Sequence, residues 1–177
     1  SGDFSSALHA VCDGTTVTIK DRVKLPHSLG HFYTALCQFI GFDRFGEEYK
    51  VMGLAPYGND TFHDEMNTLV DISTPNWFKL NQKFFDTYKG LSSAQIDKTG
   101  SIQLGPLYSK HIYKLLGFPR KRSENISQRE KDIAKSVQRQ FERASLKCLT
   151  QIDKKVRIKN LVMAGGCALN GVTNAIY

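Results

Sequence analysis

The most regular pattern of apolar and polar positions begins at Ser127 and predicts a long amphipathic helix. Ser127 followed by Glu130 forms a capping box, in which each side chain can satisfy the free backbone amide of the other residue. Beyond it, apolar side chains recur within an arc of roughly 100°, which is typical of a helix that packs on a core. These side chains are Ile133, Ala134, Val137, Phe141, Ala144, Cys148 and Ile152. The charged side chains that we expect to point away from this arc are Lys135, Arg139, Glu142, Arg143 and Lys147.

Two patterns near the start of the chain predict a hairpin and a second helix. Residues 4–12 and 15–20 flank the turn dipeptide Asp13-Gly14, which favours a β-hairpin. After Pro26, Ser28 is a candidate N-cap and Gly41 a natural stop. Between them one helical face is apolar, formed by Leu29, Phe32, Tyr33, Leu36 and Ile40.

The middle of the chain has weaker signals. Residues 46–58 predict a short helix that closes into a Pro56-Tyr57-Gly58 turn. Further expected segments are a helix at 61–71, a strand or irregular stretch at 76–85, a loop at 86–105 and a helix at 106–117.

The end of the chain, LVMAGGCALNGV, predicts a buried strand at 161–164, a loop at Gly165-Gly166 and a helix from about Ala168. A hairpin, several helices and a strand–glycine–helix unit together indicate a mixed α/β (α+β) fold. Both termini look abrupt, since there is no initiator Met and the last helix would be short. We therefore expect the sequence to be a piece of a longer protein.

Composition places the chain among globular proteins. It has 177 residues, 41% of them hydrophobic, which is enough for a real core and one or two domains. No apolar run approaches the roughly 20 residues of a membrane helix, and no signal peptide is visible. The four cysteines are far apart and form no CxxC pair, so we expect reduced thiols in a cytoplasmic protein.

The net charge of +7 is concentrated in one segment. Residues 110–159 hold 15 Lys and Arg against 5 Asp and Glu, a surplus of 10, so the rest of the chain sums to −3. A solvated helix face explains such a segment more simply than a nucleic-acid surface does.

The double glycine is the first candidate for chemistry. Glycines after a strand let the backbone approach a ligand closely, and the amides that open a following helix attract polar or anionic groups. The spacing matches neither GxGxxG nor GxxxxGK[ST], so neither a dinucleotide fold nor a P-loop is supported. The glycines could equally serve close packing alone.

Two other features could carry chemistry. His27 and His31 have the spacing of two metal ligands on a helix, but no third ligand lies nearby, so a polar contact by His27 is the simpler explanation. Lys50, between Gly46 and Gly53, could meet a phosphate or pair with Glu47. No catalytic triad can be assembled, and the catalytic residues stay unknown.

Four collinear segments resemble the O-carbamoyltransferase family, which contains nodulation and antibiotic carbamoyltransferases. They are LPHSLGHFYTALCQFIGF (25–42), GEEYKVMGLAPYG (46–58), DIAKSVQRQFE (132–142) and NLVMAGGCALNGVTNAI (160–176). The resemblance implies that residues 1–177 are the middle of a Kae1-like domain of the actin/Hsp70/sugar-kinase (ASKHA) superfamily, truncated at both ends. It implies transfer of a carbamoyl group from carbamoyl adenylate to a hydroxyl of a small-molecule acceptor. ATP and carbamoyl phosphate would form that adenylate in a YrdC-like domain of the same chain, beyond Tyr177.

The resemblance also implies site residues. Gly165 and Gly166 match the loop beside the adenosine moiety, and Asn170 lies on the helix that follows. Gly2 and Asp3 match the tail of a DGxGD/E turn, and His27, Lys50 and Gly53 fall in cleft motifs. The full-length enzyme would hold a divalent metal, iron, on ligands upstream and downstream of this segment, so no metal ligand is assigned here and the isolated segment would be inactive.

Two alternatives remain open. Kae1 relatives modify tRNA, so residues 110–159 could bind tRNA, although nucleic acid is not the expected partner. A sugar-kinase-like or chaperone-like ATPase of the same superfamily is the other alternative.

Overall fold

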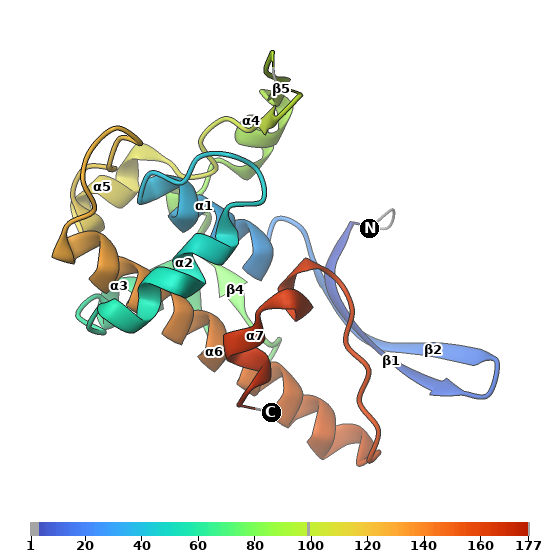
Figure 1. Ribbon diagram of the computed structural model, residues 1–177. Coiled ribbons are helices and arrows are strands. Elements are labelled where there is room, and N and C mark those ends of the chain that lie inside the picture. The colour runs from blue at the N-terminus through green and yellow to red at the C-terminus, as the bar shows by residue number, and fades with distance from the viewer. Residues whose placement is uncertain (1–3, 99, 177) are drawn as a thin grey trace.

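The computed structural model describes residues 4–98 and 100–176, so the predicted site residues Gly2 and Asp3 lie outside the described residues. Figure 1 shows a helical body from which one long β-hairpin projects. The hairpin consists of β1 (Ser5–Asp13) and β2 (Thr16–Lys24), and the main helices are α1 (Leu29–Phe39), α2 (Glu48–Leu54), α3 (His63–Leu69) and α6 (Gln128–Val156). The shorter elements are η1 (Ala55–Tyr57), β3 (Val70–Asp71), β4 (Lys79–Leu80), η2 (Gln82–Phe84), α4 (Thr87–Ser92), β5 (Gln95–Ile96), β6 (Ile102–Gln103), η3 (Lys110–Ile112), α5 (Tyr113–Leu116), η4 (Gly166–Leu169) and α7 (Gly171–Asn174). The expected mixed α/β class is confirmed.

The predicted hairpin is confirmed. β1 and β2 pair antiparallel, and Asp13 faces Thr16 across the turn. Most of β2 is exposed. Asp21 of β2 forms an ion pair with Lys155 near the C-terminal end of α6, with 2.7 Å between Oδ1 and Nζ.

Helix α1 forms the centre of the core. Ser28 is its N-cap, as predicted, and the Ser28 side chain accepts a hydrogen bond from the His31 amide. Phe32, Leu36 and Phe39 are fully buried, because the apolar face of α1 packs against α6 and α2.

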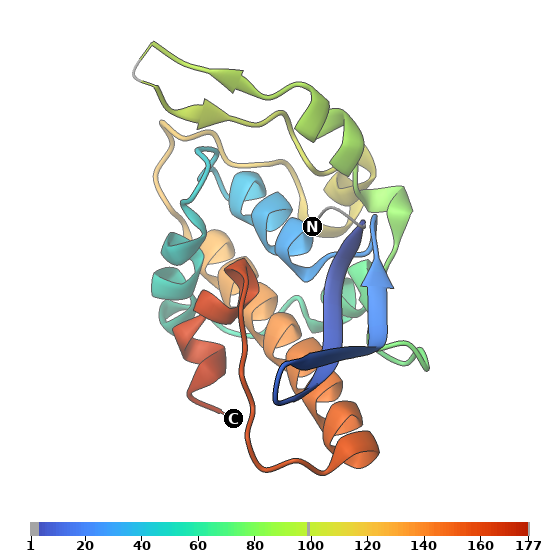
Figure 2. The same cartoon turned by 90° about the vertical axis from the view of Figure 1, so that its right-hand side faces the viewer.

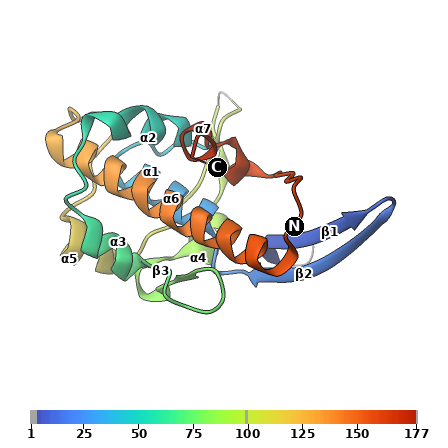
Figure 3. The same ribbon diagram turned by 90° about the horizontal axis from the view of Figure 1, so that it is seen from below.

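Helix α6 is the longest element, with 29 residues, and contacts α1, α2 and α3. Figure 3, seen from below, shows α6 crossing in front of α1, with α2 along one side and α3 along the other. The backbone amide and the hydroxyl of Ser127 both donate to the Glu130 carboxylate at its start. Burial would raise the pKa of Glu130, but the hydrogen bonds from Ser127 and Arg129 outweigh it and lower the pKa. One expectation is wrong: Glu142 does not point away but is buried, because it accepts a hydrogen bond from Gln138 inside the body.

The middle segment departs from the sequence-based expectations. The predicted loop at 86–105 contains α4 and a small β5–β6 ladder, and the predicted helix at 106–117 is reduced to η3 and α5. The physical reason lies in Gln38 of α1, whose side chain bonds the Gly105 carbonyl and the Leu107 amide. These bonds fix residues 105–107 as an extended connection, so a helix cannot begin there.

The predicted buried strand at 161–164 is also wrong. These residues are extended but exposed, and Val162 is 91% accessible. A strand needs a neighbour to satisfy its backbone amides and carbonyls, and no described segment pairs with this one. Figure 2 shows the segment, in red, descending from η4 to the end of α6 without joining a sheet.

Within residues 4–98 and 100–176, no helix is both long and apolar enough to cross a membrane.

Candidate functional site

The glycine loop, residues 165–170, keeps bare backbone at the surface. Gly165 has φ +99° and ψ 169°, a conformation that is essentially restricted to glycine. A Cβ added to Gly165 or Gly166 would meet no protein atom within 4 Å. The Gly166 and Cys167 amides open the 3₁₀ turn η4 and donate to no acceptor in the described part of the chain. The loop therefore offers both space and free donors to a ligand.

A buried polar network holds the glycine loop in place. The Asn170 side chain exchanges hydrogen bonds with Gln138 of α6 and accepts the Thr173 amide, so it caps α7. Gln138 in turn accepts the Tyr33 hydroxyl of α1 at 2.8 Å. Asn170 is 6% exposed and its side chain is engaged in this network, so the contacts observed for Asn170 hold the glycine loop in position.

His27 immediately precedes Ser28, the N-cap of α1, and the first turn of α1 approaches the same loop. Gly30, in the first turn of that helix, would bring an added Cβ to 3.6 Å from the Cys167 sulfur of η4. The Nδ1 atom of His27 accepts the Leu80 amide at 3.2 Å. Burial and the nearby Lys79 charge lower the pKa of His27, which favours the neutral ring with its proton on Nε2. His27 can therefore donate one hydrogen bond from Nε2.

Lys50 lies at the other end of α1. Its ammonium pairs with Glu47 at 2.5 Å and sits over the Phe42 ring at 5.4 Å from the centroid. Glu47 also binds Arg122 at 2.7 Å, and hydrogen bonds from Arg122 and Lys50 lower the pKa of Glu47 to about 2. Gly53 is exposed on α2, where an added Cβ would meet nothing within 4 Å.

The structure thus separates the predicted site residues into two regions. The glycine loop approaches the first turn of α1 and His27 precedes that turn, whereas Lys50 lies near the C-terminal end of α1. Helix α1 has 11 residues, so its two ends are about 16 Å apart.

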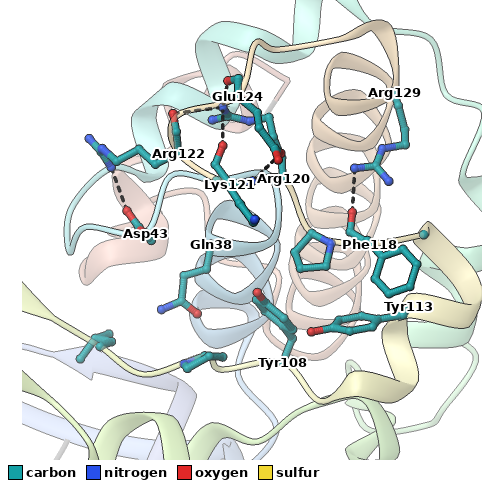
Figure 4. A pocket seen from close by; sticks show the side chains of 15 residues that line it. Gln38, Asp43, Tyr108, Tyr113, Phe118, Arg120, Lys121, Arg122, Glu124 and Arg129 are labelled. Carbon is teal, nitrogen blue, oxygen red and sulfur yellow. Dashed lines mark hydrogen bonds and ion pairs between the residues drawn. The ribbon is translucent and has the colours of Figure 1, made fainter.

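Sequence reasoning missed a cavity at the C-terminal end of α1, which we call the arginine cavity (Figure 4). Its volume is about 1010 Å³, and a smaller cavity of about 400 Å³, lined partly by Lys50, shares Gly41, Arg120, Arg122 and Glu124 with it. Its walls come from the end of α1, from Tyr108 and Tyr113, and from the connection 117–124. The local signal for this cavity is the run PRKR at 119–122, which in the sequence does not stand out from the rest of the basic segment.

Part of the basic segment 110–159 forms contacts within the molecule. Arg129 pairs with Glu130, Arg139 with Glu142, and Arg122 with Glu47 and Asp43. Lys147 donates to the Ile72 and Thr74 carbonyls. These contacts account for part of the charge of the segment without nucleic acid.

In the part of the chain that the structure describes, no group of three His, Cys, Asp or Glu side chains could hold a metal ion. His31 has a buried Nδ1 atom without a hydrogen-bond partner, but it does not join His27 in a ligand set.

Comparison with known proteins gives a consistent result. A model of the family described as Carbamoyltransferase N-terminus matches residues 1–176. Uncharacterized protein sll1178 of Synechocystis is 34% identical over 163 residues, which are 91% of this chain and 24% of that protein. Nodulation protein NolNO of Sinorhizobium fredii is 31% identical over 96% of this chain and 22% of that protein. Nodulation protein NolO of Bradyrhizobium diazoefficiens is 30% identical over 96% of this chain and 27% of that protein. The chain therefore spans about a quarter of the length of these curated relatives.

Proposed function

This chain belongs to the Carbamoyltransferase N-terminus family, and on that premise we propose that its parent protein transfers a carbamoyl group from carbamoyl adenylate to a hydroxyl of a small-molecule acceptor. In this proposal ATP and carbamoyl phosphate supply the adenylate, which forms in a YrdC-like domain elsewhere in the same protein. The present chain contributes one wall of the adenylate-binding cleft.

The observation that carries this proposal is the glycine loop. An adenylate presents a flat base, a ribose and a phosphate, which need close approach and hydrogen-bond donors. The loop supplies side-chain-free backbone at Gly165 and Gly166 and two free amides at the start of η4. Such amides suit an anion or a polar ligand atom.

The role of this wall is positioning. Carbamoyl transfer needs the reactive carbonyl held against the acceptor hydroxyl, and correct orientation alone lowers the barrier by several kcal/mol, up to about 10. The network of Gln138, Asn170 and Tyr33 is buried and hydrogen-bonded, so the loop is already ordered before a ligand arrives. His27, which precedes α1, would donate from Nε2 to a ligand oxygen.

The metal of the parent enzyme stays a prediction. A divalent cation would offset charge on the carbonyl oxygen and on the leaving phosphate. The described residues provide no group of three His, Cys, Asp or Glu side chains that could hold it.

A side chain at residue 166 tests the proposal. Gly166 needs no positive φ and has open space around it, so Gly166→Val is expected to leave the fold intact. The valine would fill the space given to the adenylate and weaken its binding about ten- to a hundredfold. The measurement is binding of adenylate, and carbamoyl transfer from carbamoyl phosphate and ATP, in the full-length protein.

The matched control is Gly171→Val, which places the same side chain at the start of α7, also in open space. It should bind adenylate as the unmodified protein does. If Gly166→Val and Gly171→Val bind adenylate equally well, the glycine loop is not part of the adenylate site. If the unmodified protein transfers no carbamoyl group to any hydroxylated acceptor, the proposed reaction is contradicted.

A further inference from the structure

The arginine cavity contains a buried cation without an anionic partner. Arg120 is 8% exposed. Its Nε donates to the Ile40 carbonyl at 2.7 Å, and its Nη1 donates to the carbonyls of Lys121, Arg122 and Glu124. No described carboxylate pairs with it, and its Nη2 donates to no described acceptor. The guanidinium carbon of Arg120 also lies over the Phe42 ring, 5.5 Å from its centroid. Carbonyl dipoles and an aromatic ring compensate the buried charge without neutralising it, so a bound anion would stabilise it further.

Two other arginines around the cavity, unlike Arg120, have carboxylate partners. Arg122 is neutralised by Glu47 and Asp43, and Arg129 by Glu130. Lys121 lines the cavity, and its ammonium has no partner in the described part of the chain. The Glu124 carboxylate accepts the Lys121 backbone amide at 2.8 Å. Arg120 and Lys121 therefore leave enough positive charge for one anionic group.

One wall of the cavity is aromatic. The ring centroids of Tyr113 and Phe118 lie 5.5 Å apart, and those of Tyr108 and Tyr113 lie 6.4 Å apart. Phe118 is 76% exposed, which is unusual for so large an apolar ring beside a cavity. Neither tyrosine hydroxyl donates a hydrogen bond to a described residue, so both are available to a polar ligand atom. Aromatic walls of this kind bind flat rings.

We propose that the arginine cavity binds a small organic anion in which one phosphate or carboxylate group is joined to a flat ring. The anionic group lies against Arg120 and Lys121, and the ring packs on Tyr113 and Phe118. The cavity volume of about 1010 Å³ is at the upper end of the range for small-molecule sites. The cavity lies at the opposite end of α1 from the glycine loop, so this site is separate from the proposed adenylate wall.

Calorimetric titration of the full-length protein with phenyl phosphate tests the inference, with inorganic phosphate and phenol as partial probes. Phenyl phosphate should bind more tightly than either fragment, because only it engages both the cations and the rings. Lys121→Gln should weaken phenyl phosphate binding about three- to fivefold, as expected for an exposed charge. Phe118→Ala should weaken phenyl phosphate about three- to tenfold and leave inorganic phosphate unchanged.

Controls separate this site from the rest of the molecule. Lys114→Gln removes the same charge from the exposed face of α5, outside the cavity lining, and should change nothing. Gly166→Val should also bind phenyl phosphate normally, whatever it does to adenylate. The inference is overturned if phenyl phosphate gives no binding up to about 10 mM. It is equally overturned if Lys121→Gln and Phe118→Ala bind like the unmodified protein, or if Gly166→Val abolishes the binding.

Discussion

At the scale of single residues, the two glycines of the GLAPYG segment have opposite environments. An added Cβ at Gly58 would lie 2.0 Å from the Lys131 carbonyl oxygen in the first turns of α6, whereas one at Gly53 would meet nothing within 4 Å. The neighbouring Asn59 amide donates to Asp132 at 2.8 Å, so the turn after η1 is fastened directly to α6. Gly58 therefore serves close packing of two backbones.

This contrast gives a paired prediction. Gly58→Ala should lower the free energy of unfolding by about 1–3 kcal/mol, because backbone has to shift to admit the methyl group. Gly53→Ala, in a helix and in open space, should be neutral or raise it by up to about 1 kcal/mol. Urea unfolding of both variants measures this. Equal effects would show that α6 moves aside easily and that Gly58 is not a packing requirement.

At the scale of elements, Glu47 joins the start of α2 to the connection 117–124. It binds Arg122 and Lys50 and accepts the Arg44 amide at 3.2 Å. Hydrogen bonds from Arg122, above all, lower the pKa of Glu47 from 4.5 to about 2. A carboxyl group with a lowered pKa stabilises the fold fully above its unfolded value, and this contribution is lost as the pH falls towards the folded value.

The expected result is a pH-dependent difference between the unmodified protein and Glu47→Gln. The variant should be less stable at neutral pH, and the difference should shrink as the pH falls from 4.5 towards 2. Chemical unfolding across this pH range measures it. A difference that does not change with pH would assign the effect of Glu47 to packing alone.

The sequence predicted those elements whose signals are local. Ser28 and Ser127 mark the starts of α1 and α6, and Asp13-Gly14 marks the hairpin, because caps and turns depend on adjacent residues. It failed at residues 106–117 and 161–164, where the outcome depends on distant partners. Gln38 fixes residues 105–107 from 67 positions away, and residues 161–164 find no strand to pair with.

The candidate site was predicted in the same uneven way. The glycine loop followed from its own residues, but nothing local showed that Asn170 would be engaged with Gln138, 32 positions earlier. The arginine cavity depends on Arg120 reaching the Ile40 carbonyl, 80 positions away, and so left only an ambiguous basic run in the sequence.

At the scale of the whole molecule, the apolar residues 161–163 form an uncovered strip. Leu161 is 55% exposed, Val162 91% and Met163 40%. Figure 2 shows this segment as an extended trace that joins no sheet. Extended apolar segments with unpaired backbone groups are prone to pair with other chains.

The 177-residue chain on its own should therefore self-associate, and Val162→Lys should shift it towards the monomer. Asn160→Lys adds the same charge two residues earlier, on an exposed polar position, and should have the smaller effect. Sedimentation velocity at several protein concentrations measures both. A monomer at every concentration, before any substitution, would contradict the expectation.

The backbone at Gly165 has a consequence for handedness. Its φ of +99° with ψ of 169° is close to the mirror image of the extended conformation that ordinary residues adopt. An L-alanine there would be strained even though the space around its methyl group is open, whereas a D-alanine introduced by chemical ligation would adopt the same torsion angles without strain. At residue 165 the backbone torsion angles decide which residue fits, and the size of its side chain is secondary.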